Sequence, residues 1–182
     1  MIPRKTLTVF FATVFVAAIG FNFMLENGES KEVKSFFPDR NQWELKRISI
    51  TDDNDKSLVF KRVKCVWVIG DDNMPSDEIK ATALAEKLLN LQSDDLVTEK
   101  EGDHERLKVS SSQFSRKVEL NFKDETSMTL LLGEATMGRP DHARRVDETG
   151  VYLIYEPKIT KISLEPNVWF GSADDVSGVS TK

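Results

Sequence analysis

The stretch CVWVIGDDNMPSDEIKATALAEKLLNL, residues 65–91, joins a β-branched, aromatic run to a run with helical spacing. The first run ends at Gly70 and is typical of a buried strand. Pro75 and Ser76 start the second run, and acidic residues in its first turn suit the positive end of a helix. Its apolar face is predicted to consist of Ile79, Ala83, Leu84, Leu88 and Leu91. We therefore expect Gly70-Asp71-Asp72 to form the turn between a core strand and the main helix.

Alternating apolar residues elsewhere predict further strands on both sides of this unit. Residues 116–122 and 127–133 form one expected hairpin, 144–155 form a second, and 134–143 read as a loop. The pattern favours an α+β fold over residues 43–170, a mainly antiparallel sheet of about six or seven strands with one principal packed helix. Residues 26–42 are expected to be a tether and residues 171–182 a flexible tail.

Composition limits the classes of function that the chain can have. Of its 182 residues 40% are hydrophobic and 30% charged, which is typical of a packed globular domain. The net charge of −5 argues against a nucleic-acid partner. The single cysteine, Cys65, allows no internal disulfide, and its apolar neighbours predict a buried, inert thiol.

The amino terminus carries the pattern of a membrane segment. Arg4 and Lys5 precede residues 7–25, which contain no charge. A helix over that run would span about 28 Å, close to the ~30 Å hydrocarbon core of a bilayer. We expect residues 1–25 to be a signal-anchor in contact with membrane lipid; a cleaved signal peptide with Ala18-Ile19-Gly20 as its site is the alternative. The basic flank predicts a single-pass inner-membrane protein with its domain outside the cytoplasm, in the periplasm if the cell is Gram-negative.

Several short motifs resemble catalytic or metal sites but have simpler interpretations. Gly70-Asp71-Asp72 lacks a returning strand after it, and the acidic turn at 52–55 lacks the spacing of a calcium loop. The serines of 110–115 lie in no nucleophile elbow. The two histidines are far apart in sequence, so we expect no catalytic, cofactor or metal residues.

One local concentration of positive charge stands out in this acidic chain. Guanidinium groups and an imidazole at close spacing could bind a phosphate, a carboxylate or an acidic partner. A solvated loop with ion pairs to Asp141, Asp147 and Glu148 is the other interpretation. The candidate contact residues are Arg139, His142, Arg144 and Arg145.

The order of these features resembles domain-of-unknown-function family 4340, over roughly residues 43–170. The residues that carry the resemblance are Ile48-Ser49-Ile50, Val66-Trp67-Val68-Ile69, LAEKLLNLQSDDLV at 84–97, TLLLG at 129–133, GVYLIY at 150–155 and Trp169. The resemblance implies a membrane-anchored, exported protein, some of whose relatives sit beside ABC-transporter components of the gliding-motility type. It implies no catalytic residues. This chain differs in the basic insertion EATMGRPDHARR after Gly133.

These observations favour a non-enzymatic, membrane-tethered envelope domain that binds a membrane or envelope protein and supports an ABC-transporter-type or other envelope complex. An extracytoplasmic binder of an anionic small molecule or glycan, acting through the Arg139–Arg145 loop, is the alternative. Neither function requires a cofactor.

Overall fold

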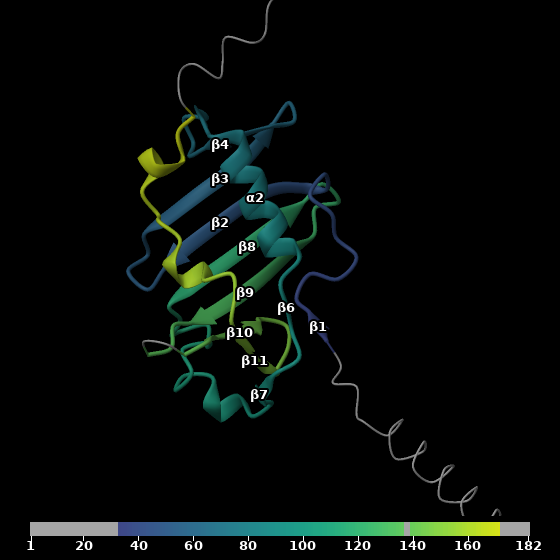
Figure 1. The fold of residues 1–182 in the computed structure, drawn as a ribbon, viewed down its shortest axis with the longest axis vertical. Coiled ribbons are helices and arrows are strands. Elements are labelled where there is room, and N and C mark those ends of the chain that lie inside the picture. Colours follow the sequence, from purple (N-terminus) through teal and green to yellow (C-terminus); the bar gives the residue numbers. More distant parts are fainter. Residues whose placement is uncertain (1–32, 137–138, 172–182) are drawn as a thin grey trace, which may run out of the picture. The chain divides into compact units, whose positions relative to one another are not determined.

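A computed structural model of the chain describes residues 33–136 and 139–171. Within them, nine strands form one antiparallel sheet in the order β5-β4-β3-β2-β8-β9-β10-β11-β7 (Figure 1). These strands are β2 (Leu45–Asp52), β3 (Ser57–Val63), β4 (Val66–Ile69), β5 (Met74–Pro75), β7 (Leu96–Thr98), β8 (Arg116–Phe122), β9 (Ser127–Gly133), β10 (Asp141–Arg145) and β11 (Val151–Ile154). A separate pair joins β1 (Lys34–Ser35) to β6 (Gln92–Ser93).

The predicted α+β class is confirmed for this part of the chain. The hairpin expected at 116–122 and 127–133 is β8 and β9, with the same bounds. The sheet has more strands than the six or seven expected, because β5 contains only two residues. A run that short shows no period in a sequence.

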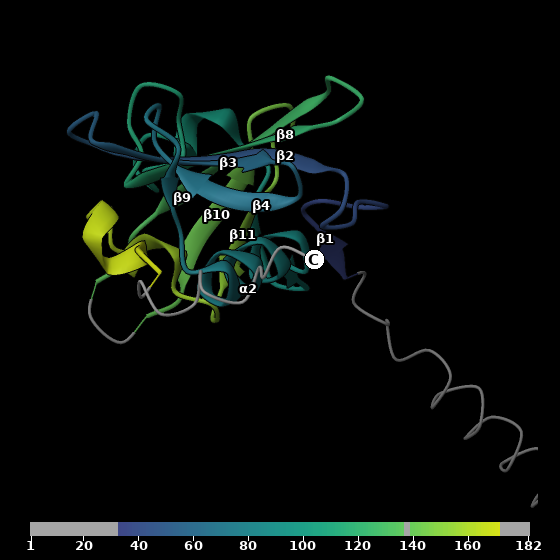
Figure 2. The same ribbon diagram turned by 90° about the horizontal axis from the view of Figure 1, so that it is seen from above.

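The helix α2 (Glu78–Leu89) lies across one face of the sheet (Figures 1 and 2). It begins at Glu78, and the Asp77 side chain caps it by accepting a hydrogen bond from the Lys80 N–H. The start predicted at Pro75 and Ser76 is wrong, because Pro75 belongs to β5.

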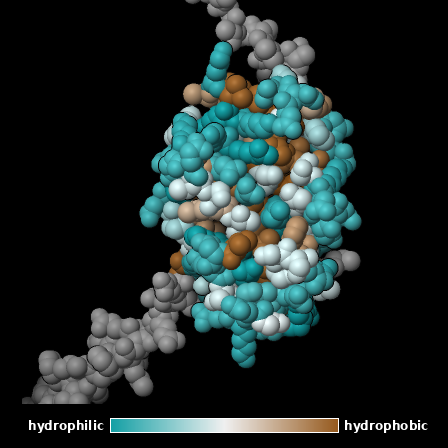
Figure 3. All heavy atoms as spheres, turned by 180° about the vertical axis from the view of Figure 1, so that it is seen from behind, coloured by the Kyte–Doolittle hydropathy of each residue, from teal (hydrophilic) through white to brown (hydrophobic). Residues whose placement is uncertain are grey.

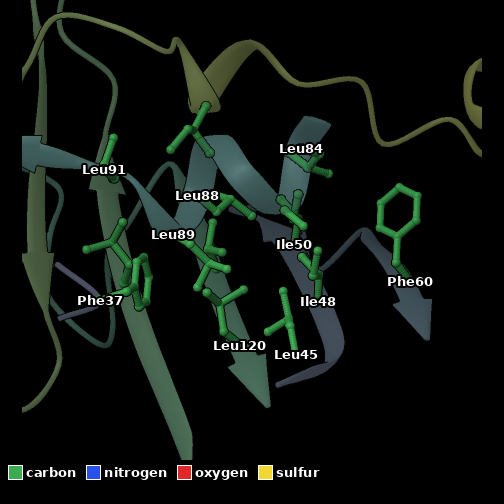
Figure 4. Close-up of a cluster of buried hydrophobic side chains, with 14 of the residues drawn as sticks. Phe37, Leu45, Ile48, Ile50, Phe60, Leu84, Leu88, Leu89, Leu91 and Leu120 are labelled. Carbon is green, nitrogen blue, oxygen red and sulfur yellow. The ribbon is translucent and has the colours of Figure 1, made fainter. Parts of the chain in front are cut away.

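The predicted apolar face of the helix is also wrong in part. Ile79 is 81% exposed, and the buried helix residues are Ala81, Leu84, Ala85, Leu88 and Leu89. Two alanines take part because the helix lies close to the sheet. Figure 4 shows the buried leucines of the helix packed over Leu45, Ile48, Ile50 and Leu120 of the strands.

The carboxy-terminal segment covers the same face as α2. It contains the short 3₁₀ turns η2 (Ile159–Lys161) and η3 (Pro166–Trp169). The Trp169 ring meets the Phe60 ring edge to face, with centroids 5.1 Å apart, and Ile159 is buried in the core. This segment therefore forms part of the core layer.

The packed structure begins before residue 43. The residues just after β1, Phe36 and Phe37, are buried in the main core, and the Phe36 ring contacts Tyr152 edge to face. The described part of the expected tether, residues 33–42, therefore contributes side chains to the domain. No helix of the described residues is long and apolar enough to cross a membrane. The expected signal-anchor at 1–25 lies outside the described residues.

The other face of the sheet is only partly covered. Residues 99–115, with the 3₁₀ turn η1 (Glu101–Asp103), pack over β9 and β11. They form a small second core of Leu107, Val109, Leu131 and Val151, with Phe114 at its margin. Side chains of β3 and β4 on this face remain partly or fully exposed. The two faces thus differ in what they offer to a partner.

Candidate functional sites

The four basic residues predicted to form one contact are divided by the structure. Arg139 is exposed and precedes β10, whereas His142, Arg144 and Arg145 belong to the strand itself. The loop predicted at 134–143 is therefore shorter than expected, since β10 begins at Asp141. Because neighbouring side chains of a strand point to opposite faces, Arg144 and Arg145 cannot act on one ligand side by side.

Arg144 is occupied by the fold. It is 6% exposed, and its guanidinium donates hydrogen bonds to the carbonyl oxygens of Val109, Arg145, Val146 and Glu148 at 2.8, 3.1, 3.3 and 2.8 Å. Burial lowers the pKa of Arg144 from its usual value. This side chain links the β10–β11 turn to the covering segment, and its donors point at backbone rather than at solvent.

The next two basic residues are also engaged or uncharged. Arg145 Nε donates to Asp147 Oδ1 at 2.9 Å, and its Nη1 lies 3.6 Å from Glu148 Oε1. The hydrogen bond from Arg145 lowers the pKa of Asp147. Burial lowers the pKa of the half-buried His142, so its imidazole is neutral at pH 7. Of the predicted set, Arg139 is the exposed charge that has no ion pair among the described residues.

Arg139 lines an open groove of about 640 Å³ beside β10. Lys158 and Lys161 also line it, but so do three carboxylates, Glu134, Asp141 and Glu156. The Lys161 ammonium pairs with Glu134, and Lys158 Nζ lies 3.8 Å from Asp141 Oδ1. The charges of this groove are therefore balanced.

Gly70-Asp71-Asp72 lies in a hairpin turn. Gly70 has φ +70°, and the chain returns as β5, which pairs Met74 with Ile69. The prediction that a helix follows the turn directly is therefore wrong. Asp71 pairs with Lys61, and that hydrogen bond lowers its pKa. No group of three or more potential metal-ligating side chains gathers in the described part of the chain.

Cys65 is exposed, so the prediction of a buried thiol is wrong. Lys64 and Cys65 have φ of 49° and 71° and form the tight turn between β3 and β4, where Val63 pairs with Val66. Two successive residues at positive φ are typical of two-residue hairpin turns, although glycine or asparagine is the usual choice. Cys65 therefore belongs to the turn and not to the strand that carries Trp67 and Ile69.

The tip of this hairpin carries exposed apolar side chains on both faces. Trp43 is 62% exposed, and the Arg62 guanidinium lies 5.3 Å from its ring centroid and 4.7 Å from that of the buried Trp67. Val63 and Val66 are exposed on the opposite face. Figure 3 shows that a hydrophobic area lies in the upper part of this face, where Figure 1 places β3 and β4. We call Trp43, Arg62, Val63 and Val66 the hairpin-tip surface.

The packing beneath this surface leaves polar atoms without partners. Gln42 Oε1, Arg62 Nε and Trp67 Nε1 are buried and have no hydrogen-bond partner within the described protein. Arg62 Nη1 does donate to the Gln42 carbonyl oxygen at 3.0 Å. Unsatisfied buried polar groups cost about 1–3 kcal/mol each. Proteins tolerate such unsatisfied buried groups mainly at functional sites, so the Trp43–Arg62–Trp67 stack is a candidate contact site.

Only a weak signal in the sequence points to this surface. Two valines that flank a two-residue turn are a common hairpin pattern, and Trp43 lies outside any strand. The stack depends on contacts between residues about 20 positions apart, which no local period reveals.

Comparison with known proteins gives one match. No curated protein and no solved structure matches the chain. Residues 67–173, more than half of the chain, match a protein family that covers α2, most of the sheet and the carboxy-terminal segment. The chain belongs to the family described as Domain of unknown function (DUF4340).

Proposed function

We propose that the chain is a non-catalytic, membrane-anchored interaction domain that works outside the cytoplasm and binds a protein partner in an envelope complex, of ABC-transporter type or another kind. The hairpin-tip surface carries this proposal. Trp43 and Arg62 are of the residue types that most often dominate protein interfaces. Arg62 stacks on the buried Trp67 and also contacts the Trp43 ring, which holds both side chains in place before binding and reduces the entropy lost on association.

The expected partner encloses the end of the hairpin and has an acidic rim, because Trp43 and Arg62 lie on one face of the tip and Val63 and Val66 on the other. Val63 and Val66 offer an apolar contact on their face, and the exposed neighbours Lys64 and Arg47 supply positive charge. This local charge contrasts with the net charge of −5 for the whole chain. A complementary acidic rim would steer a partner to this end of the sheet.

The proposed location is supported by the uncharged run at residues 7–25 and the basic pair before it. It can be tested with Cys65, the single cysteine, because its thiol is exposed at the hairpin tip. A membrane-impermeant maleimide should label Cys65 in intact cells, or in outer-membrane-permeabilised cells if Gram-negative. Labelling only after lysis of the inner membrane would contradict an extracytoplasmic domain.

The same thiol provides a test of partner binding. A photoactivatable maleimide on Cys65 should crosslink the full chain in native membranes to one defined protein. Trp43→Ala should abolish that product, whereas Ile79→Ala, at a residue 81% exposed on α2, should leave it unchanged. If the crosslinked product still forms in the double variant Trp43→Ala/Val66→Ser, the assignment to this surface is wrong. If the wild-type chain gives only background crosslinks in native membranes, the proposed role in protein interaction is wrong.

The second candidate is an anion binder, and the exposed Arg139 is the observation that favours it. Its guanidinium lies beside Lys158 and Lys161 in the groove next to β10. Sulfate or phosphate should then raise the melting temperature of the wild type but not of Arg139→Ala. Equal responses of the two proteins would rule out a specific anion site there.

A further inference from the structure

A second groove lies between α2 and the carboxy-terminal segment, and it shares Glu156 and Lys158 with the groove that Arg139 lines. Its volume is about 360 Å³, within the range of small-ligand sites. Leu84, Leu88 and Ile159 form its buried floor, and Ile162 and Trp169 form a wall that remains partly exposed. The groove is therefore an apolar trough that opens on the helix-covered face.

The wall of this groove is fixed by contacts with the rest of the fold. The Trp169 ring packs edge to face on Phe60, and its Nε1 donates a hydrogen bond to the Ser163 carbonyl oxygen at 2.9 Å. Floor residues belong to the main core. A ligand would thus meet a preformed surface, and little ordering would oppose its binding.

Lysines surround the apolar floor. Lys80 and Lys87 lie two helical turns apart on α2, and Lys158 faces them from the carboxy-terminal segment. Glu156 is the one carboxylate in the lining. Lys80 Nζ lies 3.1 Å from Asp77 Oδ2, and Lys158 Nζ donates to the Arg139 carbonyl oxygen at 3.0 Å. Lys87 has no ion pair among the residues that the structure describes, so its ammonium is available to an anion.

We propose that this groove binds a small anionic amphiphile, a single apolar chain that ends in a carboxylate or a phosphate. The chain lies on the leucine and isoleucine floor against Trp169, and the anionic end meets Lys87 at the rim. Lysine stems extend the apolar floor while their ammonium groups stay in water, so one rim serves both parts of such a ligand. A neutral alcohol of equal length would lack the ionic contact.

The test uses the full chain in phosphatidylcholine nanodiscs, with octanoate, octyl phosphate and 1-octanol as probes. Octanoate or octyl phosphate should change tryptophan emission saturably, and Trp169→Phe should remove the change although two other tryptophans remain. Both anions should also protect Lys87 from acetylation, read by peptide mass spectrometry. The tighter of the two anions identifies the headgroup, and either order supports the proposal.

Matched variants separate the contribution of the ionic contact from that of the ligand's apolar tail. Lys87→Gln should weaken binding of the anions by about fivefold, the upper range for an exposed ion pair, and leave 1-octanol unaffected. Lys123→Gln, at an exposed lysine in the β8–β9 turn, should leave the affinity for all three probes unchanged.

Equal affinity for octanoate and 1-octanol would overturn the proposal. Emission changes that persist in Trp169→Phe without protection of Lys87 would overturn it as well. Protection of Lys87 by an alternating Leu-Glu peptide but not by octanoate would assign the groove to an acidic peptide instead and also overturn it.

Discussion

Glu78 Oε2 accepts a hydrogen bond from the Trp67 backbone N–H at 2.8 Å. The Trp67 carbonyl oxygen accepts one from Ser76 Oγ at 2.7 Å. Since β5 pairs only with Val68 and Ile69, it leaves the edge of β4 at Trp67 uncovered. Side chains at the start of the helix therefore satisfy this edge and prevent another strand from pairing there. The outer edge of β4 is thus closed at Trp67 by residues that follow the Gly70 turn.

Glu78→Ala should lower the free energy of unfolding by about 1–3 kcal/mol, because it leaves the Trp67 N–H without its acceptor. Glu78→Gln keeps an amide oxygen within reach of the Trp67 N–H, so it should lower the free energy of unfolding by less. The measurement is urea denaturation followed by tryptophan emission. Glu86→Ala, at an exposed glutamate of the same helix, should stay within about 0.5 kcal/mol of the wild type. Equal losses for the alanine variants at 78 and 86 would contradict a role for the edge contact.

Arg144→Ala should destabilise the domain by about 3 kcal/mol or more, because four carbonyl oxygens lose a charged donor and two of the lost bonds are only 2.8 Å long. Arg144→Lys should recover little of this loss, since one ammonium cannot reach acceptors in several directions. Chemical denaturation measures both changes. Arg139→Ala provides the exposed comparison, with a change within about 0.5 kcal/mol. A small loss of stability in Arg144→Ala would instead favour the interpretation of this side chain as an anion contact.

Gly133→Ala should destabilise the domain. A Cβ at this position would lie 1.9 Å from the Leu107 carbonyl oxygen, so the backbone of the covering segment would have to move. We expect a loss of about 1–3 kcal/mol from overpacking, measured by thermal and chemical unfolding. Gly102→Ala, where a Cβ meets nothing within 4 Å, is the matched control and should be close to neutral. Similar melting temperatures for the two variants would mean that the 99–115 segment shifts freely.

The Asp124 carboxylate should make the stability of the domain depend on pH in the acid range. Hydrogen bonds from the Thr126 hydroxyl and then from Arg40 lower its pKa from 3.8 to about 2. Because the folded pKa is the lower one, the stabilising effect is complete above about pH 4 and is lost as the pH falls toward 2. Asp124→Asn should therefore be less stable than the wild type at neutral pH, and the gap should narrow between pH 4 and 2. Melting curves across that range measure it, and a gap independent of pH would refute this explanation.

Much of the architecture follows from the sequence. The alternation at 116–122 and 127–133 matches β8 and β9, because long strands with one buried face repeat every two residues. The helix in 76–91 was recognisable from its spacing and acidic start. Membership of the family was likewise suggested by the order of core positions and agrees with the match over residues 67–173.

Tertiary contacts decided the details on which function depends. Cys65 is exposed because it belongs to the turn between β3 and β4, where Lys64 and Cys65 both adopt positive φ without glycine or asparagine. The helix turned Ile79 outward because the close approach to the sheet favoured Ala81 and Ala85. Arg144 became a structural donor because the covering segment placed the Val109 carbonyl oxygen 2.8 Å from its Nε. Local periodicity fixes which elements form, whereas which side chains stay free for a partner depends on contacts between residues distant in the chain.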